Sequence, residues 1–110
     1  MQPMPAMRFA ADLLKGQVVL VTGGGTGMGR ATAIEMARCG ADVVLLGRRA
    51  EPIEDCAKII GELGRKAIAI PTDIRLPEQI ETAMQRIKDE FGRLDVLVNN
   101  AGGQFVTPAR

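Results

Sequence analysis

Hydrophobic positions along the chain gather into four short runs that are separated by longer stretches of mixed character. The runs are rich in valine, isoleucine and leucine and alternate little with polar residues; they are Val18–Val21, Val43–Leu46, Ala67–Ile70 and Leu94–Val98. Strands of a parallel sheet show this pattern, because helices cover both faces of such a sheet and leave no face for polar residues. The sequence therefore predicts four buried parallel strands.

The stretches between these runs carry apolar residues at helical spacing, which places one apolar stripe along each helix. The two clearest stripes are Ile80, Ala83, Met84, Ile87 and Phe91, and Ile53, Cys56, Ala57, Ile60 and Leu63. Pro52 and Pro77 suit the first turn of a helix, while Gly40, Gly64 and Gly92 suit the C-terminal ends. Strands that alternate with helices predict a doubly wound α/β fold, and right-handed crossovers give the strand order 3-2-1-4.

Composition narrows the function classes. The net charge of +1 gives no reason to expect nucleic acid as a partner, and no apolar run is long enough to span a membrane. The chain has no histidine and no tyrosine, which excludes Ser-His-Asp and Cys-His catalysis, histidine-ligated zinc and a tyrosine acid from these residues. Cys39 and Cys56 make neither a disulfide framework nor a metal site, so we expect reduced thiols in a cytoplasmic protein.

The strongest candidate site is the glycine-rich segment Thr22–Arg30, which follows the first predicted strand and opens the first helix. Glycines let the backbone approach a ligand closely, and a helix start favours a pyrophosphate. Its candidate binding residues are Gly23, Gly25, Thr26, Gly27, Met28 and Gly29. A triphosphate-binding loop would continue with lysine and a hydroxyl residue, but Arg30 and Ala31 follow here. The alternative is a glycine-rich turn that binds no ligand.

Three motifs together resemble the short-chain dehydrogenase/reductase family. They are TGxxxGxG at Thr22–Gly29, an acid with an apolar neighbour at Asp73–Ile74, and NNAG at Asn99–Gly102. The resemblance implies a Rossmann-type domain in which Asp73 and Ile74 contact the adenine of a dinucleotide. It also implies that Asn100, Ala101 and Gly102 line the cofactor. Two structural alternatives remain: Asn99 satisfies backbone groups at a strand end, and Asp73 is a helix N-terminal acid.

The end of the second strand indicates which nicotinamide cofactor fits. NAD-binding sites of this type place an acid there to hold the ribose 2′-hydroxyl, but this chain has Gly47 followed by Arg48 and Arg49. A guanidinium can bind a 2′-phosphate with two parallel hydrogen bonds. The sequence therefore predicts NADP(H), with Arg48 as the leading contact and Arg49 as the second, unless both are solvated surface residues. Glu51 is assigned to the helix dipole instead.

The resembled family does its proton chemistry with a Tyr-x-x-x-Lys pair that lies beyond the fourth strand, and this chain ends at Arg110. We therefore expect a leader over residues 1–16 and, over residues 17–110, a partial NADP-binding domain that lacks its C-terminal half. Asn100–Phe105 resembles enoyl-CoA and 2,4-dienoyl-CoA reductases. The resemblance implies a homo-oligomeric parent enzyme that reduces an enoyl-CoA, a small-molecule substrate; a carbonyl substrate, as in 3-oxoacyl or sugar-alcohol reductases, is the alternative. The alternative is a stand-alone, non-catalytic dinucleotide-binding module. In either case the outer edge of the fourth strand is expected to be open and to invite pairing with another chain.

Overall fold

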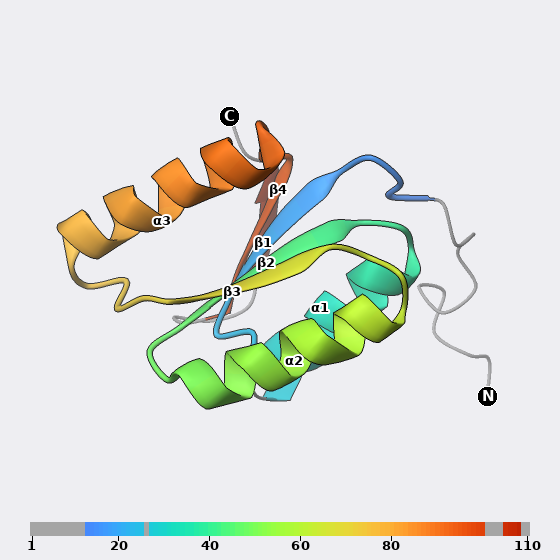
Figure 1. The fold of residues 1–110 in the computed structure, drawn as a ribbon, viewed down its shortest axis with the longest axis horizontal. Helices are drawn as coiled ribbons and strands as arrows, with labels where there is room; N and C mark the ends of the chain where they lie inside the picture. Colours follow the sequence, from blue (N-terminus) through green and yellow to red (C-terminus); the bar gives the residue numbers. More distant parts are fainter. Residues whose placement is uncertain (1–12, 26, 101–104, 109–110) are drawn as a thin grey trace.

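The computed structural model describes residues 13–25, 27–100 and 105–108. Its elements, in chain order, are β1 (Val18–Thr22), α1 (Gly27–Arg38), β2 (Asp42–Gly47), α2 (Ala50–Glu62), β3 (Ala67–Pro71), α3 (Pro77–Phe91), β4 (Val96–Asn99) and β5 (Phe105–Pro108). The strands form one sheet in the order β3-β2-β1-β4-β5 (Figure 1). Its first four strands are parallel, which confirms the predicted order 3-2-1-4.

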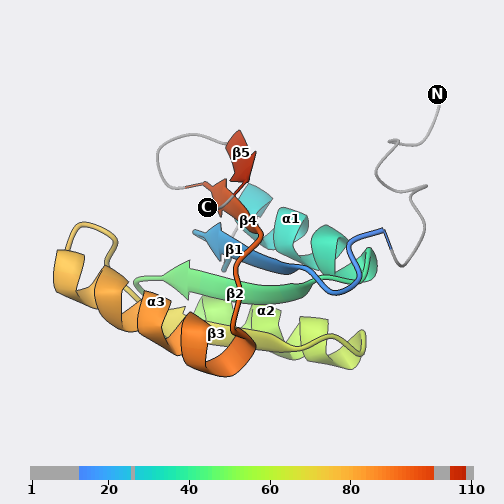
Figure 2. The ribbon, with the colours of Figure 1, turned by 90° about the horizontal axis from the view of Figure 1, so that it is seen from above.

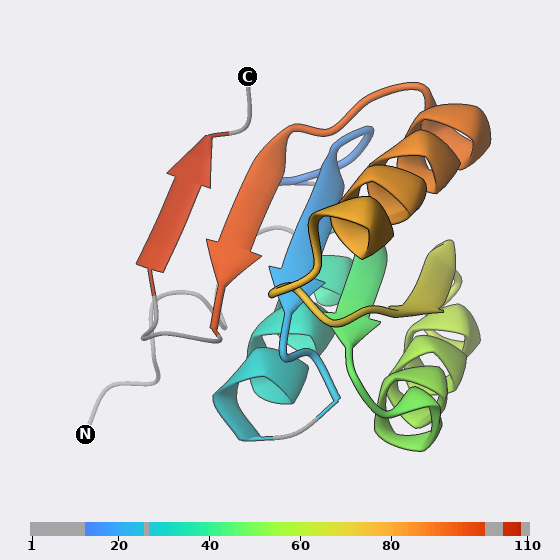
Figure 3. The same cartoon turned by 90° about the vertical axis from the view of Figure 1, so that its left-hand side faces the viewer.

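The helices form a layer on each face of the sheet, with α1 and α2 on one face and α3 on the other (Figures 1 and 3). Successive residues of β1 serve both layers, because side chains of a strand alternate between its two faces. Val19 and Val21 pack in one core cluster with residues of α1 and α2, including Ala33 and Ile60. Leu20 packs in the other cluster with residues of α3. Burial of β1 on both faces explains its unbroken apolar run.

Helix ends follow the sequence signals. Pro77 begins α3, and Gly92 ends it with a left-handed φ of 74° that favours glycine. Met84 and Leu63, which the pattern placed on the apolar stripes, are 39% and 42% exposed. Leu63 lies past the end of α2, and Met84 lies on α3, the one described helix of its layer, where no second helix flanks it. Among the described residues, no helix has both the length and the apolar character needed to cross a membrane.

The fourth strand begins two residues later than predicted, at Val96 instead of Leu94. Leu94 is apolar because it packs against the core cluster beneath α3, so its hydrophobicity reflects burial in a connection and not strand pairing. Asp95 then closes the start of the strand, because its carboxylate accepts the N–H of Val18 at 2.8 Å. Its own N–H donates to the Val18 carbonyl at 2.9 Å.

The prediction of an open edge on the fourth strand is wrong. In the structure β5 pairs antiparallel with β4, from Val96 opposite Pro108 to Asn99 opposite Phe105 (Figure 2). The sequence favours this pairing locally, because Phe105, Val106 and Thr107 are residue types that suit strands. The outer edge of β4 is therefore already paired within the chain and is not available to a second copy.

Candidate dinucleotide-binding site

The carboxyl ends of β1, β2 and β3 meet at one edge of the sheet, where parallel α/β folds bind their ligands. Two backbone hydrogen bonds hold these ends together: the Gly23 N–H donates to the Leu46 carbonyl at 2.8 Å, and the Thr72 N–H donates to the Gly47 carbonyl at 2.7 Å. A cleft of about 360 Å³ opens at this edge, between the ends of β1 and β2 and the loop of residues 72–75. Of the residues that the sequence predicts for the site, Gly23, Arg48, Asp73 and Ile74 line this cleft.

A second depression of about 540 Å³ adjoins the first and extends toward the start of α2. Both share Gly23, Gly47 and Arg48 in their walls, and the second adds Gly25 and Arg49. The glycine loop and the two arginines therefore face one continuous groove. An extended ligand with several phosphate groups could lie along such a groove, with cations on one side and main-chain amides on the other.

The glycine loop packs so tightly that two of its positions have no room for a side chain. A Cβ on Gly29 would overlap the carbonyl carbon and oxygen of Gly23, and a Cβ on Gly25 would come within 2.6 Å of Pro52 at the start of α2. The Gly23 contact is with backbone, which cannot move aside easily. Gly29 therefore lets α1 approach the end of β1, and Gly25 lets the glycine loop approach the start of α2.

The start of α1 offers an anion site. Gly27 and Met28 are exposed and begin the helix, and the first N–H groups of a helix have no partner within it. The first turn of the helix carries no acidic residue that would repel an anion from the positive end of the helix dipole. The arrangement suits a phosphate, because main-chain amides and the dipole act on the same negative charge.

Thr22 connects the glycine loop to the end of β4. Its buried hydroxyl lies 3.1 Å from Asn99 Oδ1 and 3.4 Å from the Val98 carbonyl, and it accepts the N–H of Asn100 at 2.9 Å. Asn99 Oδ1 thus contacts the side-chain hydroxyl of Thr22. The Asn100 side chain lies beside Gly23 and Gly29, so it forms part of the back wall of the loop.

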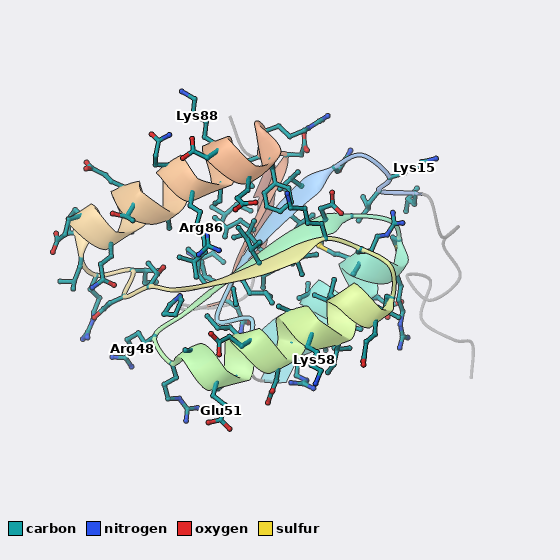
Figure 4. The ribbon with its side chains drawn as sticks, viewed as in Figure 1. Lys15, Arg48, Glu51, Lys58, Arg86 and Lys88 are labelled. Atoms are coloured by element: carbon teal, nitrogen blue, oxygen red, sulfur yellow. The ribbon has the colours of Figure 1, made fainter. Side chains whose placement is uncertain are left out.

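Arg48 and Arg49 occupy the turn between β2 and α2, and both are exposed. Figure 4 shows Arg48 at this turn. Among the described residues, neither guanidinium takes part in a hydrogen bond or an ion pair. Glu51 lies in the first turn of α2, where its charge complements the helix dipole as expected. Arg48 lines both parts of the groove, whereas Arg49 lines only the part near α2 and a further depression beside Arg30. Of the two arginines, Arg48 thus lines more of the groove that could hold a ligand.

Asp73 faces the cleft from the loop after β3, and its carboxylate is held by Arg75. Nε and Nη2 of Arg75 donate to the two carboxylate oxygens at 3.0 and 2.9 Å, and the Arg75 N–H adds a third bond at 3.0 Å. These bonds lower the pKa of Asp73 to about 2. The N-cap of α3 is Leu76, so Asp73 does not cap that helix. Its N–H instead donates to Gln79 Oε1 at 2.7 Å.

Some predicted residues lie outside the described part of the chain: Thr26, Ala101 and Gly102. Ile74 is 37% exposed on the rim of the cleft. Sequence reasoning missed Thr22, Thr72 and Arg75 as groups that build the cleft. Arg75 carried a usable signal, because an arginine two residues after an aspartate in a turn can reach back to its carboxylate.

Comparisons with known proteins agree with this geometry. A sequence model described as short chain dehydrogenase matches residues 17–110. A peroxisomal 2,4-dienoyl-CoA reductase from Danio rerio is 41% identical over 92% of this chain and 34% of its own length. L-sorbose reductase from Gluconobacter frateurii, solved with NADPH and L-sorbose, superimposes with a TM-score of 0.79 at 31% identity, covering 84% of this chain and 36% of that one.

A third relative carries the other nicotinamide cofactor. The structure of a D-mannonate oxidoreductase from Haemophilus influenza with bound NAD superimposes with a TM-score of 0.78 at 32% identity, and covers 82% of this chain and 32% of that one. The chain thus spans about one third of the length of the relatives it matches. Sequence, fold and groove agree, and the chain belongs to the short-chain dehydrogenase family.

Proposed function

We propose that this chain binds NADP(H) and forms the cofactor-binding part of an oxidoreductase. The observation that carries the proposal is Arg48, an exposed guanidinium that lines the groove at the end of β2, where an NAD-binding site would have an acid. Gly47 stands at that acid's position. A 2′-phosphate would meet a cation there, and no carboxylate at this strand end would repel it.

The groove accounts for the other parts of the cofactor. The diphosphate would lie against the glycine loop and the start of α1, where a side chain on Gly29 would disturb the cradle. The adenine would lie in the cleft beside Asp73 and Ile74. Asn100 supports the loop from behind, and Thr26, Ala101 and Gly102 complete the proposed set. When bound, the nicotinamide supplies or accepts a hydride.

The proposed substrate is an acyl-CoA with a conjugated or α,β double bond. Support comes from the sequence around Asn100–Phe105 and from the Danio rerio relative, whose name is that of a 2,4-dienoyl-CoA reductase. The described residues offer no tyrosine for proton transfer, since the chain contains none. We therefore propose cofactor binding for this chain and assign it no role in proton transfer.

Replacement of Arg48 by aspartate tests the cofactor assignment. In the complete product of the reading frame, Arg48→Asp should weaken NADPH binding by about 10- to 100-fold, because hydrogen bonds to charged groups contribute about 1.5–3 kcal/mol each. NADH binding should weaken little or improve, because the new carboxylate can accept a ribose hydroxyl. Calorimetric dissociation constants for both cofactors provide the measurement.

Lys58→Asp is the matched control, since it makes the same change of charge on the exposed side of α2 (Figure 4). It should leave the ratio of the NADPH and NADH dissociation constants unchanged. An unchanged ratio in the Arg48 variant would contradict the proposal, because it would mean that Arg48 does not distinguish the two cofactors.

A further inference from the structure

Three charged side chains line the cleft at the carboxyl end of the sheet, and they are not equivalent. Arg48 comes from the end of β2, while Asp73 and Arg75 come from the loop after β3. Asp73 is the only acid among these lining residues, and its side chain is 19% exposed. A carboxylate in this position could pair with either arginine. Which one it pairs with decides which guanidinium is left for a ligand.

In the structure, Asp73 pairs with Arg75. The guanidinium of Arg75 meets both carboxylate oxygens in a two-point arrangement, and the Arg75 N–H binds Oδ1 as well. Paired hydrogen bonds of this kind fix the orientation of both groups. The Arg48 side chain makes no hydrogen bond or ion pair among the described residues. Its charge nevertheless lies close enough to help lower the pKa of Asp73, after the larger effect of Arg75. Arg48 thus attracts Asp73 electrostatically but forms no hydrogen bond or ion pair with it.

We propose that Arg75 is a specificity-determining residue for the cofactor's 2′-phosphate, although it acts through Asp73. Arg75 occupies and neutralises the carboxylate, which keeps Arg48 available for the phosphate. This inference rests on the proposed function of Arg48. It adds a second residue, on a different loop, to the discrimination between NADPH and NADH.

Removal of Arg75 would act on the 2′-phosphate in two ways. The Asp73 carboxylate would stay ionised at neutral pH, because an ordinary aspartate titrates near pH 4. It would then attract Arg48 away from the phosphate and would itself repel the phosphate. A ligand without the 2′-phosphate would meet neither penalty. The signature of the mechanism is therefore a change in the ratio of two affinities and not a general loss of binding.

A merely structural role for the Asp73–Arg75 pair predicts a different pattern. Arg75 is 71% exposed, and exposed ion pairs contribute little to folding stability. If the pair only shaped the loop, its loss would disturb the adenine site and weaken all adenine nucleotides alike. The conservative variant Arg75→Lys, which keeps the charge but loses the two-point geometry, should fall between the wild type and Arg75→Gln.

The experiment compares adenosine 2′,5′-bisphosphate with 5′-AMP as probes of the complete protein, by calorimetry at low salt. Arg75→Gln should weaken the bisphosphate about two- to fivefold relative to 5′-AMP, the range expected of a solvent-exposed charge interaction. The double variant Asp73→Asn/Arg75→Gln should return the ratio of the two affinities to that of Asp73→Asn alone. Lys88→Gln, on the outer side of α3 (Figure 4), should leave the ratio unchanged.

Two results would overturn the inference: an Arg75→Gln variant that weakens both probes by the same factor, or a double variant that keeps the altered ratio. Thermal unfolding of each variant shows that the protein remains folded. Arg48→Asp separates this inference from the proposed function. If Arg48→Asp fails to weaken the bisphosphate selectively, the proposed function fails and the inference falls with it. If it succeeds while the Arg75→Gln ratio is unchanged, only the role of Arg75 is refuted.

Discussion

An arginine–aspartate pair with two hydrogen bonds stands at each end of the sheet, and we expect the two pairs to have different roles. At the carboxyl end, Arg75 binds both oxygens of Asp73. At the amino end, Arg93 binds both oxygens of Asp95, with distances of 2.6 and 2.8 Å. Each pair joins residues two apart in the sequence, and the two carboxylates are similarly shielded, with side-chain exposures of 19% and 21%.

The third contact of each carboxylate separates their roles. Asp95 accepts the N–H of Val18 and so joins the start of β1 to the start of β4. Asp73 accepts the N–H of Arg75 itself and makes no such bond across the sheet; it faces the cleft instead. We expect these chemically similar pairs to differ in function, because parallel α/β sheets bind ligands at the carboxyl ends of their strands. Variants at the amino end should change stability alone, and variants at the carboxyl end should change ligand binding.

The largest effect is expected from Gly29→Ala at the carboxyl end. The new Cβ would overlap the Gly23 carbonyl group, so α1 must move away from β1. We expect a loss of about 1–3 kcal/mol in the free energy of unfolding, as for overpacking in a core, and loss of measurable NADPH binding. Denaturant unfolding and calorimetry measure the two quantities.

Gly61→Ala provides the control for this variant. Gly61 lies in α2 with open space around it, so alanine should raise stability by about 0.5–1 kcal/mol and leave NADPH binding unchanged. If Gly29→Ala bound NADPH as well as Gly61→Ala does, the close contact between the loop and α1 would not matter for the ligand.

A smaller effect, on stability alone, is expected from Asp95→Asn at the amino end. The amide oxygen can still accept the Val18 N–H, but the charged contact with Arg93 is lost. We expect a decrease of about 1 kcal/mol in the free energy of unfolding and an unchanged NADPH dissociation constant. A shift in that constant would show that the two ends of the sheet are coupled, against the comparison drawn above.

The smallest expected effect is the dependence of folding stability on acidic pH at Asp95. Arg93 and, less strongly, the Val18 N–H lower the pKa of Asp95 in the folded protein. The unfolded chain therefore takes up the proton first, and the stability that the carboxylate provides is present above its ordinary pKa of 3.8 and is lost as the pH falls below it. The stability difference between wild type and Asp95→Asn should shrink from pH 5 to pH 2. A constant difference would mean that Asp95 contributes no charged contact.

The sequence predicts most of this architecture because its central strands are continuous runs of apolar residues. β1 and β2 are buried on both faces, and their runs of valine and leucine show this directly. The predicted start of β4 was wrong because Leu94 is an apolar residue in a buried connection, and its sequence pattern does not differ from that of a strand residue. β5 was not predicted from the sequence, because its four residues include Thr107 and Pro108 and form a less apolar run than the other strands.

At the site, the glycine loop could be predicted because its constraint is steric and local, as Gly29 shows. The ion-pair partner of Asp73 could not be predicted, because the choice between Arg48 and Arg75 depends on the conformation of the loop after β3. Arg48 and Arg49 are adjacent and chemically identical. The sequence ranks Arg48 first, and the structure adds that Arg48 lines both parts of the groove whereas Arg49 lines one of them.

The central claim is that main-chain amides of the loop after β1 bind the diphosphate of a nicotinamide dinucleotide. Titration of the isotopically labelled, complete protein with NADPH, followed through the amide resonances, tests this claim most directly. The account predicts that the amides of Gly25, Gly27, Met28 and Gly29 shift most, while that of Val18 at the other end of the sheet stays in place. Unchanged loop resonances at millimolar NADPH in a folded sample would contradict it.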